Sequence, residues 1–310
     1  MSTHAPITLL FPGQGTEALG MSAGWEANEA WVRTLAAAEL LSDFPLRHLM
    51  SAGPLAALRA DRCAPCAVVA HSVGLFRAHR EAGMPMPMLA AGHSLGFFSA
   101  VVAAQVVPLE GVFELINAVE DLSEAAFGRE THGMAFFIGL TELELRQALV
   151  SHPEMVLSNL NGQAQFTVSG PRAGLESLVA ALGPQAMKAG LLPVRHPLHG
   201  VHMVPLLPAV TRRLVRWVPN VPDFPLLSHA DGRLLTKAHE IWDEAIASVG
   251  LPVCWPAVVK SLRSLEHSVF ECGHGAQLAN LTRWADRRLQ VVSLQDPGRL
   301  ASWQATSAHI

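Results

Sequence analysis

The chain has 310 residues, of which 50% are apolar and 15% are charged, so it can bury a large core and is expected to be globular. A formal net charge of −4 and the lack of a basic tract give no electrostatic reason to expect nucleic acid as a partner. No signal-peptide pattern opens the chain, and no apolar run reaches the roughly 20 residues that a membrane helix needs. These features predict a cytoplasmic protein, away from the membrane, that acts on a small molecule or on another protein.

Short apolar runs alternate with helical segments along most of the chain. This alternation predicts an α/β fold with a mainly parallel sheet. A strand that ends in the glycine turn Pro12-Gly13-Gln14-Gly15 is expected at 7–11, and a strand followed by a helix over 97–106 is expected at 88–91. Later strands are expected at 225–228, 268–271 and 290–294.

The segment 130–195 has a different order of elements, strand, helix, strand, strand, helix, strand, which is the ferredoxin-like pattern. The six elements are expected at 134–140, 142–150, 155–160, 165–169, 173–182 and 191–194, with a turn at Asn161-Gly162. We therefore expect a large α/β domain built from residues 1–129 and 196–310, with a small ferredoxin-like domain, 130–195, inserted into it.

The pentapeptide Gly92-His93-Ser94-Leu95-Gly96 lies between a predicted strand and a predicted helix. A G-x-S-x-G turn in this position exposes a serine hydroxyl, and the backbone N–H that follows can point at an oxyanion. The start of the helix adds a partial positive charge. The same residues would also serve as a small-residue turn that closes a βα unit, so the pattern alone leaves both a nucleophile and a plain turn open.

A second loop, Phe11-Pro12-Gly13-Gln14-Gly15, follows another strand at its carboxyl end, where open α/β sheets place their sites. Together with the later GHSLG pentapeptide, it resembles the malonyl-CoA:acyl carrier protein transacylase family, which includes the acyltransferase domains of polyketide synthases. Further agreement lies in Gly139-Leu140, Asn159-Leu160-Asn161 and the stretch 271–275. The resemblance covers nearly the whole chain and implies a large α/β-hydrolase-like domain with an inserted ferredoxin-like domain.

The resemblance implies a role for several residues. Ser94 would be the acylated nucleophile, and the backbone N–H groups of Gln14 and Leu95 would form the oxyanion hole. The family's histidine base maps onto His199, in Pro197-Leu198-His199, and a backbone carbonyl from the segment 251–255 would hold it. His93, beside the nucleophile, would line the site without being the base.

The neighbours of His199 allow a second interpretation. His196 and His202 lie three residues to either side, and H-x-x-H-x-x-H is a possible metal-binding pattern. Three imidazoles at this spacing would need a continuous helix to share one face, which Pro197 and Gly200 disfavour. We expect no metal and no bound cofactor, and we expect the other two histidines on the pocket wall or the surface, with His196 able to touch substrate.

Four scattered cysteines predict reduced thiols in place of a disulfide scaffold. Cys63-Ala64-Pro65-Cys66 has the C-x-x-C spacing of redox sites. It lacks a thioredoxin-like strand before it, which favours packing at the start of a helix.

Malonyl-transferring members of the family hold the substrate's carboxylate with an arginine on the helix after the nucleophile helix. The equivalent position here is Val119, and no lysine or arginine occurs between Arg80 and Arg129. An unpaired buried carboxylate costs on the order of several kcal/mol, so an acyl group without a free carboxylate is predicted. The predicted substrate-binding residues are His93, Phe97, Val119, Asn161 and His196, although the rings of Phe97 and Phe98 would also fit a core.

The predicted function is a ping-pong acyltransferase, in polyketide biosynthesis, that moves an acyl group between acyl-CoA or another acyl thioester and the phosphopantetheine arm of an acyl carrier protein. Three alternatives remain open. The same acyl-enzyme would make an acyl hydrolase that clears carrier proteins if water replaced the thiol. A malonyl transacylase would need a displaced carboxylate site, such as Arg195. A catalytically silent docking subunit is a third alternative, which the intact Ser94 and His199 disfavour.

Overall fold

A computed structural model describes residues 6–299 and 302 of the chain. Its larger sheet has six strands in the order β11-β10-β1-β2-β7-β8. All neighbouring strands are parallel except the short final pair, β7 and β8. The strands are β1 (Ile7–Phe11), β2 (Leu89–Gly92), β7 (Leu226–Leu227), β8 (Leu234–Leu235), β10 (Ser268–Glu271) and β11 (Val291–Ser293). The α/β fold with a mainly parallel large sheet is therefore confirmed.

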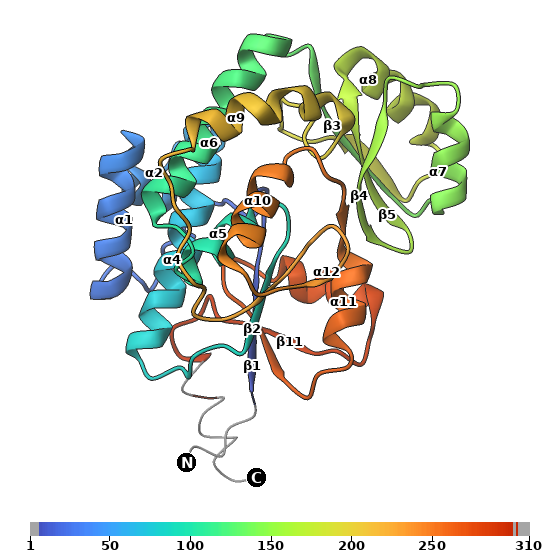
Figure 1. Cartoon of the computed structure of the whole chain (residues 1–310). Coiled ribbons are helices and arrows are strands. Elements are labelled where there is room, and N and C mark those ends of the chain that lie inside the picture. The colour runs from blue at the N-terminus through green and yellow to red at the C-terminus, as the bar shows by residue number, and fades with distance from the viewer. Residues whose placement is uncertain (1–5, 300–301, 303–310) are drawn as a thin grey trace.

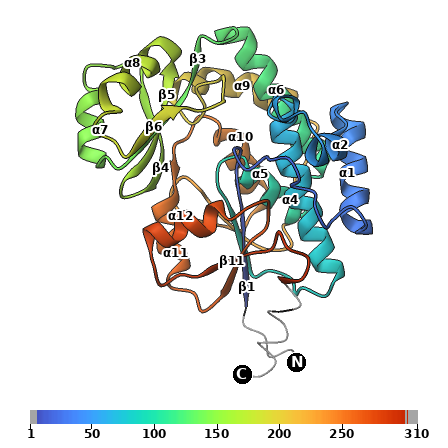
Figure 2. The ribbon, with the colours of Figure 1, turned by 180° about the vertical axis from the view of Figure 1, so that it is seen from behind.

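Helices cover both faces of this sheet, which explains why its central strands are apolar throughout. Leu9 and Phe11 of β1 belong to one apolar core, and Leu10, which points the other way, belongs to a second one. Figures 1 and 2 show helices α1, α2 and α4 on one side of the central strands and α11 and α12 on the other. The carboxyl ends of β1 and β2 lie next to each other, because Phe11 pairs with Gly92.

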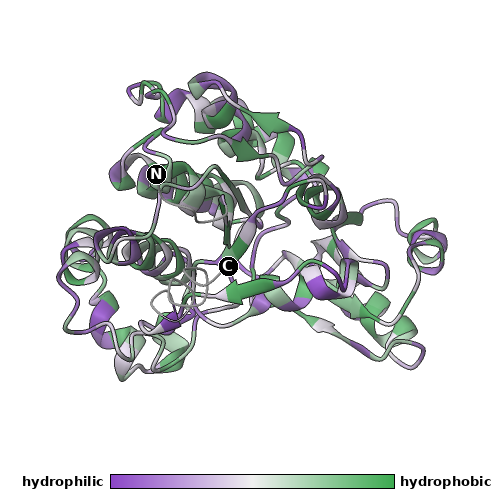
Figure 3. Cartoon of the chain, turned by 90° about the horizontal axis from the view of Figure 1, so that it is seen from below, coloured by the Kyte–Doolittle hydropathy of each residue, from purple (hydrophilic) through white to green (hydrophobic). Residues whose placement is uncertain are grey.

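The helices of the described residues differ widely in length. They are α1 (Glu29–Ser42), α2 (Leu46–Ser51), α3 (Leu55–Leu58), α4 (Cys63–Glu81), α5 (Gly96–Ala103), α6 (Leu109–Phe127), α7 (Glu142–Leu149), α8 (Arg172–Leu182), the 3₁₀ helix η1 (Val201–Leu206), α9 (Leu207–Arg213), α10 (Ala238–Ala247), α11 (Trp255–Leu262) and α12 (Gln277–Ala285). Apolar residues follow the central strands, and strongly hydrophilic ones gather on outer helices and loops (Figure 3). In the part of the chain that the structure describes, no helix has both the length and the apolar character that crossing a membrane requires.

A second sheet has five strands in the order β6-β3-β5-β4-β9, with a separate apolar core. Four of its strands, with α7 and α8, follow the predicted ferredoxin-like order. They are β3 (His132–Ile138), β4 (Val156–Gly162), β5 (Gln165–Pro171) and β6 (Lys188–Leu191). The fifth strand, β9 (Val253–Cys254), comes from far along the chain and pairs in parallel with β4. The domain limits at 129/130 and 195/196 stay a prediction.

Two details of this sheet correct the sequence prediction. The hairpin between β4 and β5 turns at Gln163 and Ala164, and Asn161 lies on β4 instead of in the turn, because Gly162 pairs with Gln165. Strand β6 ends at Leu191, where the predicted strand begins, because residues 188–191 pair with β3. Both errors concern the limits of elements, which short apolar runs specify less well than their existence.

Candidate active site

Ser94 stands on a sharp turn between β2 and α5. Its φ is 53°, in the left-handed region that residues other than glycine rarely adopt. A Cβ atom on Gly92 would overlap the backbone of Gly96 and Phe97, and one on Gly96 would overlap the carbonyl of Phe11. The two glycines of the G-x-S-x-G pattern are therefore required by close packing of the turn, which presents the serine above the ends of β1 and β2.

His199 contacts Ser94 from the loop before η1. The distance between Ser94 Oγ and His199 Nε2 is 2.7 Å. On the other side of the ring, His199 Nδ1 lies 2.8 Å from the carbonyl oxygen of Ser248 and 3.0 Å from that of Leu251. Because carbonyl oxygens only accept, Nδ1 carries the proton and Nε2 accepts the hydrogen bond that Ser94 Oγ donates. In this tautomer His199 is arranged to remove the proton of the serine hydroxyl.

The surroundings of His199 favour its neutral form. The residue is only 5% exposed, and burial lowers the pKa of its imidazole to about 4, although the two carbonyls partly oppose the shift. Its backbone is held too, since its N–H donates to the carbonyl of Val249 at 2.7 Å and its φ is 59°. The imidazole is thus fixed in position and unprotonated at neutral pH.

Two backbone N–H groups border the serine. Those of Gln14 and Leu95 have no hydrogen-bond partner among residues 6–299, and both residues line the same cavity as Ser94. The first turn of α5 begins directly after Leu95 and adds the positive end of a helix dipole. The oxyanion hole predicted from these two N–H groups stays a prediction.

The cavity beside the serine is mostly apolar. Its lining residues are Gln14, Pro65, Ser94, Leu95, Phe98, Ile116, Val119, Glu120, Leu198, His199, Ser248 and Val249. Val119 therefore lies on the wall, and its contact with substrate stays a prediction. No arginine or lysine belongs to the lining among the described residues. Phe97 is fully buried against His229 in the large core, and Phe98 takes the place on the wall that was predicted for Phe97.

Two other predicted substrate-binding residues bind each other. His93 Nε2 lies 2.7 Å from Asn161 Oδ1, a contact in which the imidazole N–H donates. The ring of His93 also packs edge-on against Trp255, at a centroid distance of 5.4 Å. Since His93 belongs to the serine turn and Asn161 to β4, the pair joins the nucleophile to the second sheet, and neither residue lines the cavity.

Comparison with known proteins agrees with this geometry. The model of the acyl transferase domain family matches residues 8–271. The chain belongs to the acyl transferase domain family. It is 30% identical over 303 residues to the malonyl CoA-acyl carrier protein transacylase of Salmonella typhimurium, covering 96% of this chain and 98% of the relative. It is 28% identical over 300 residues to the enzyme of that name from Bacillus subtilis, covering 94% of each chain.

Solved structures resemble this acyl transferase along its whole length. An acyl carrier protein S-malonyltransferase from Vibrio cholerae matches with a TM-score of 0.86 at 27% identity, covering 96% of this chain and 100% of the other. A malonyl-transacylase solved with the acyl-carrier protein of a type II PKS matches with a TM-score of 0.90, also at 27% identity, covering 97% and 100%. The two-sheet architecture is thus that of known acyltransferases.

The three histidines of the H-x-x-H-x-x-H stretch contact three different partners in this acyl transferase. His199 contacts Ser94, His196 Nε2 lies 2.9 Å from Glu120 Oε2, and His202 Nε2 lies 2.7 Å from the carbonyl oxygen of Glu154. Within the described residues, no group of three or more His, Cys, Asp or Glu side chains is placed to hold a metal ion. His196 itself does not line the cavity.

Cys63 and Cys66 lie in the first turn of α4 and are free thiols. Both are almost fully buried, and burial raises the pKa of Cys63 to about 11 and that of Cys66 to about 12. Thiols of this kind are poor nucleophiles, because little thiolate forms at neutral pH. Their neighbour Pro65 lines the cavity, so this turn contributes to the site by packing.

Two groups beside His199 were not predicted from the sequence. One is the carbonyl of Ser248, which lies before the segment 251–255 predicted to hold His199. The other is His229, whose fully buried ring packs edge-on against that of His199 at a centroid distance of 5.7 Å. Burial holds the pKa of His229 well below its usual value. A strand was expected at 225–228, so the sequence already placed His229 at the carboxyl end of a parallel strand, where α/β sheets place their sites.

Proposed function

We propose that this acyl transferase moves an acyl group without a free carboxylate between CoA or pantetheine thioesters and an acyl carrier protein, through an ester on Ser94. The observation that carries the proposal is the 2.7 Å hydrogen bond between Ser94 Oγ and the neutral His199, at the mouth of an apolar cavity. A serine activated by a buried imidazole is the arrangement that forms acyl-enzymes.

In the first half-reaction, His199 Nε2 takes the proton of Ser94 as Oγ attacks the thioester carbonyl carbon. The carbonyl oxygen becomes an oxyanion next to the N–H groups of Gln14 and Leu95, and one donor of this kind is typically worth roughly 3 to 4 kcal/mol of barrier. The C–S bond then breaks, and His199 returns the proton to the leaving thiolate. An ester on Ser94 and a free thiol remain.

In the second half-reaction, the thiol of an acceptor repeats these steps in reverse. His199 takes the thiol proton as sulfur attacks the ester carbonyl, and it gives the proton back to Ser94 Oγ when the C–O bond breaks. The carbonyls of Ser248 and Leu251 stabilise the imidazolium that forms twice in each cycle, since both accept from Nδ1–H. No redox cofactor enters this balance of atoms.

The preference for an acyl group without a free carboxylate rests on the cavity wall. Val119 occupies the position of the carboxylate-binding arginine in the family pattern, and the neighbouring Glu120 adds a negative charge. Nearby arginines are engaged elsewhere: Arg62 with Asp121 and Arg195 with Asp61, the latter at 2.7 Å. Among the described residues, the cavity lining offers a malonyl carboxylate no cation, and burying it unpaired costs on the order of several kcal/mol.

The partners in this proposal follow from the relatives. The names of these relatives describe malonyl transfer between CoA and acyl carrier protein, and one was solved with the carrier of a type II PKS. A phosphopantetheine thioester on a carrier protein is therefore the proposed donor or acceptor, in polyketide or related biosynthesis.

Intact-mass spectrometry of the purified protein with malonyl-CoA, acetyl-CoA, butyryl-CoA and hexanoyl-CoA tests the proposal. We expect the mass of one acyl group on Ser94, absent in Ser94→Ala, with malonyl-CoA the slowest donor. Adding a phosphopantetheinylated carrier protein should move the label to the carrier. Fastest loading by malonyl-CoA would overturn the specificity claim, and release of free acid in place of acyl-carrier would make the protein a hydrolase.

A further inference from the structure

Glu120 is the one charged residue in the cavity lining, within the part of the chain that the structure describes. It lies on α6, next to Val119. Its Oε2 accepts a hydrogen bond from His196 Nε2 at 2.9 Å, and its Oε1 has no hydrogen-bond partner among residues 6–299. Its side chain is 17% exposed, although the surrounding wall is apolar. The carboxylate of a residue that lines the cavity thus keeps one acceptor oxygen without a protein partner among residues 6–299.

His196 supplies only one hydrogen bond to this carboxylate. Its Nδ1 is buried and has no hydrogen-bond partner in the described structure. The tautomer with its single proton on Nε2 satisfies the contact with Glu120 and leaves no N–H unpaired at Nδ1. In that tautomer the imidazole is neutral, so the pair keeps the negative charge of the carboxylate.

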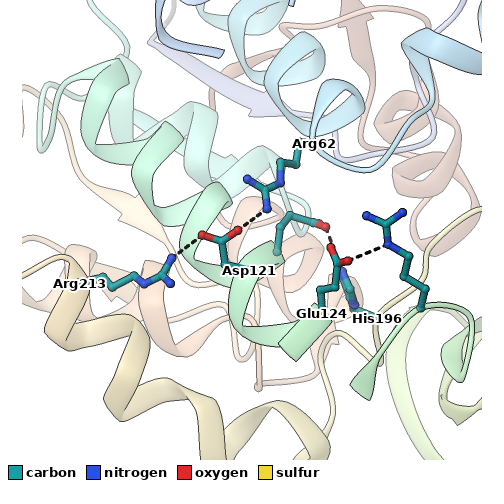
Figure 4. Close-up of polar contacts among 7 residues, drawn as sticks. Arg62, Asp121, Glu124, His196 and Arg213 are labelled. Carbon is teal, nitrogen blue, oxygen red and sulfur yellow. Dashed lines mark hydrogen bonds and ion pairs between the residues drawn. The ribbon is translucent and has the colours of Figure 1, made fainter. Parts of the chain in front are cut away.

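Two other acidic residues on the same part of α6 are neutralised differently. Asp121 pairs with Arg62 and Arg213, and Glu124 pairs with Arg129 at 2.7 Å. Figure 4 shows these pairs beside His196. Glu120 alone of the three has no arginine within ion-pair distance among the described residues, and it is also the one that lines the cavity. A carboxylate that is only 17% exposed and lacks a paired arginine favours a ligand that brings a cation.

We propose that Glu120 selects acyl groups that carry a hydrogen-bond donor, best a protonated amine, and that it binds this donor through Oε1. The class of substrate is therefore an amino-acyl or hydroxy-acyl thioester with its donor away from the carbonyl. This inference rests on the proposed acyl-enzyme at Ser94 and names the group that the enzyme carries. Val119, Ile116 and Phe98 would contact the chain's methylene groups.

Pantetheine thioesters of matched length test the inference. Their acyl chains end in a methyl, a hydroxymethyl, an ammoniomethyl or a carboxylate group, with the series repeated for chains of three to six heavy atoms. The rate of Ser94 acylation is followed by rapid quenching and intact-mass spectrometry. At the best length we expect the amine to react about tenfold or more faster than the methyl chain, with the hydroxyl between them and the carboxylate slowest.

Two substitutions at Glu120 separate charge from hydrogen bonding. Glu120→Leu removes both, so the amine-to-methyl rate ratio should fall to near one. Glu120→Gln keeps the shape and an acceptor oxygen, so the hydroxyl preference should partly remain while the amine preference is lost. Glu124→Gln, which loses a charge paired at the surface on the same helix, is the matched control and should leave the ratios as they are.

The outcomes are distinct. A methyl or carboxylate chain that reacts as fast as the amine at every length would overturn the role of Glu120 while acylation of Ser94 still stands. An amine preference that survives in both Glu120 variants would overturn it as well. Wild-type protein that no thioester in the series acylates would contradict the proposed function and, with it, this inference.

Discussion

In the active-site cavity, Ser94 Oγ and His199 Nε2 lie 2.7 Å apart, and backbone groups hold both residues in position. Carbonyls of Ser248 and Leu251 hold the imidazole, and glycines shape the serine turn. The rest of the lining consists mainly of side chains, Val119 and Glu120 among them. Backbone geometry therefore fixes Ser94 and His199, whereas substitution of the wall side chains can change the chemistry of the cavity without disturbing the serine turn or His199.

Removing the base should have the largest effect on the reacting end. His199→Ala is expected to slow Ser94 acylation about 10²- to 10⁴-fold, because no other group takes the serine proton. Single-turnover acylation with butyryl-CoA, followed by intact mass, measures the rate. His202→Ala, which loses contacts with the carbonyl of Glu154 and the ring of His132 and none with Ser94, should keep the wild-type rate. Equal losses in both variants would show that the stretch 196–202 acts through folding instead.

The acyl end should respond to an added cation. Val119→Arg is expected to raise the ratio of malonyl to butyryl loading about tenfold, because a guanidinium can pair a carboxylate in two hydrogen bonds. Adding Glu120→Gln should raise the ratio further, since the neighbouring carboxylate would otherwise compete for the arginine. Acylation rates with the two CoA esters give the ratio. An unchanged ratio in the double variant would show that the acyl group does not lie against Val119.

The pH dependence of acylation probes the environment of the base. With a pKa of about 4, His199 stays neutral as the pH falls from 7 to 5, so the acylation rate should be level there and decline only near pH 4. Single-turnover rates from pH 4 to 8 measure this. A decline with a midpoint near 6.5, the ordinary value for histidine, would mean that His199 is more hydrated than its 5% exposure indicates.

Folding must be followed in the same buffers. Burial lowers the pKa of His71 to about 3, so the unfolded chain binds more protons than the folded one below about pH 6.5. Stability is therefore present above that pH and is lost progressively as the pH falls toward the folded-state values of His71 and His199. Circular dichroism at each pH separates this loss from titration of the base.

The smallest effect is expected at Arg195, the cation beside the histidine stretch. Its side chain is 39% exposed and pairs with Asp61 at 2.7 Å, and it does not line the cavity. Arg195→Ala should change malonyl-CoA and butyryl-CoA loading by less than about twofold, since exposed ion pairs contribute roughly 0 to 1 kcal/mol. Malonyl loading that collapses in this variant alone would place a carboxylate site at Arg195.

Sequence alone was sufficient wherever a local rule decides the structure. Strands β1 and β10 have the predicted limits, because continuous apolar runs between turn residues specify buried strands. The serine turn was predicted too, since only glycine fits at Gly92 and Gly96. The family resemblance implied His199 and Val119 as further site residues, and both line the cavity.

Only the tertiary structure decided contacts between segments far apart in the chain. Phe97 and Phe98 differ by one helical step, so the packing of α5 decides which ring faces the cavity. The pairing of His196 with Glu120, the carbonyl of Ser248 on His199, and the addition of β9 to the second sheet join residues with no common local pattern. Local turns and periodicity thus determined the turn that carries Ser94, whereas long-range packing decided which residues surround the cavity.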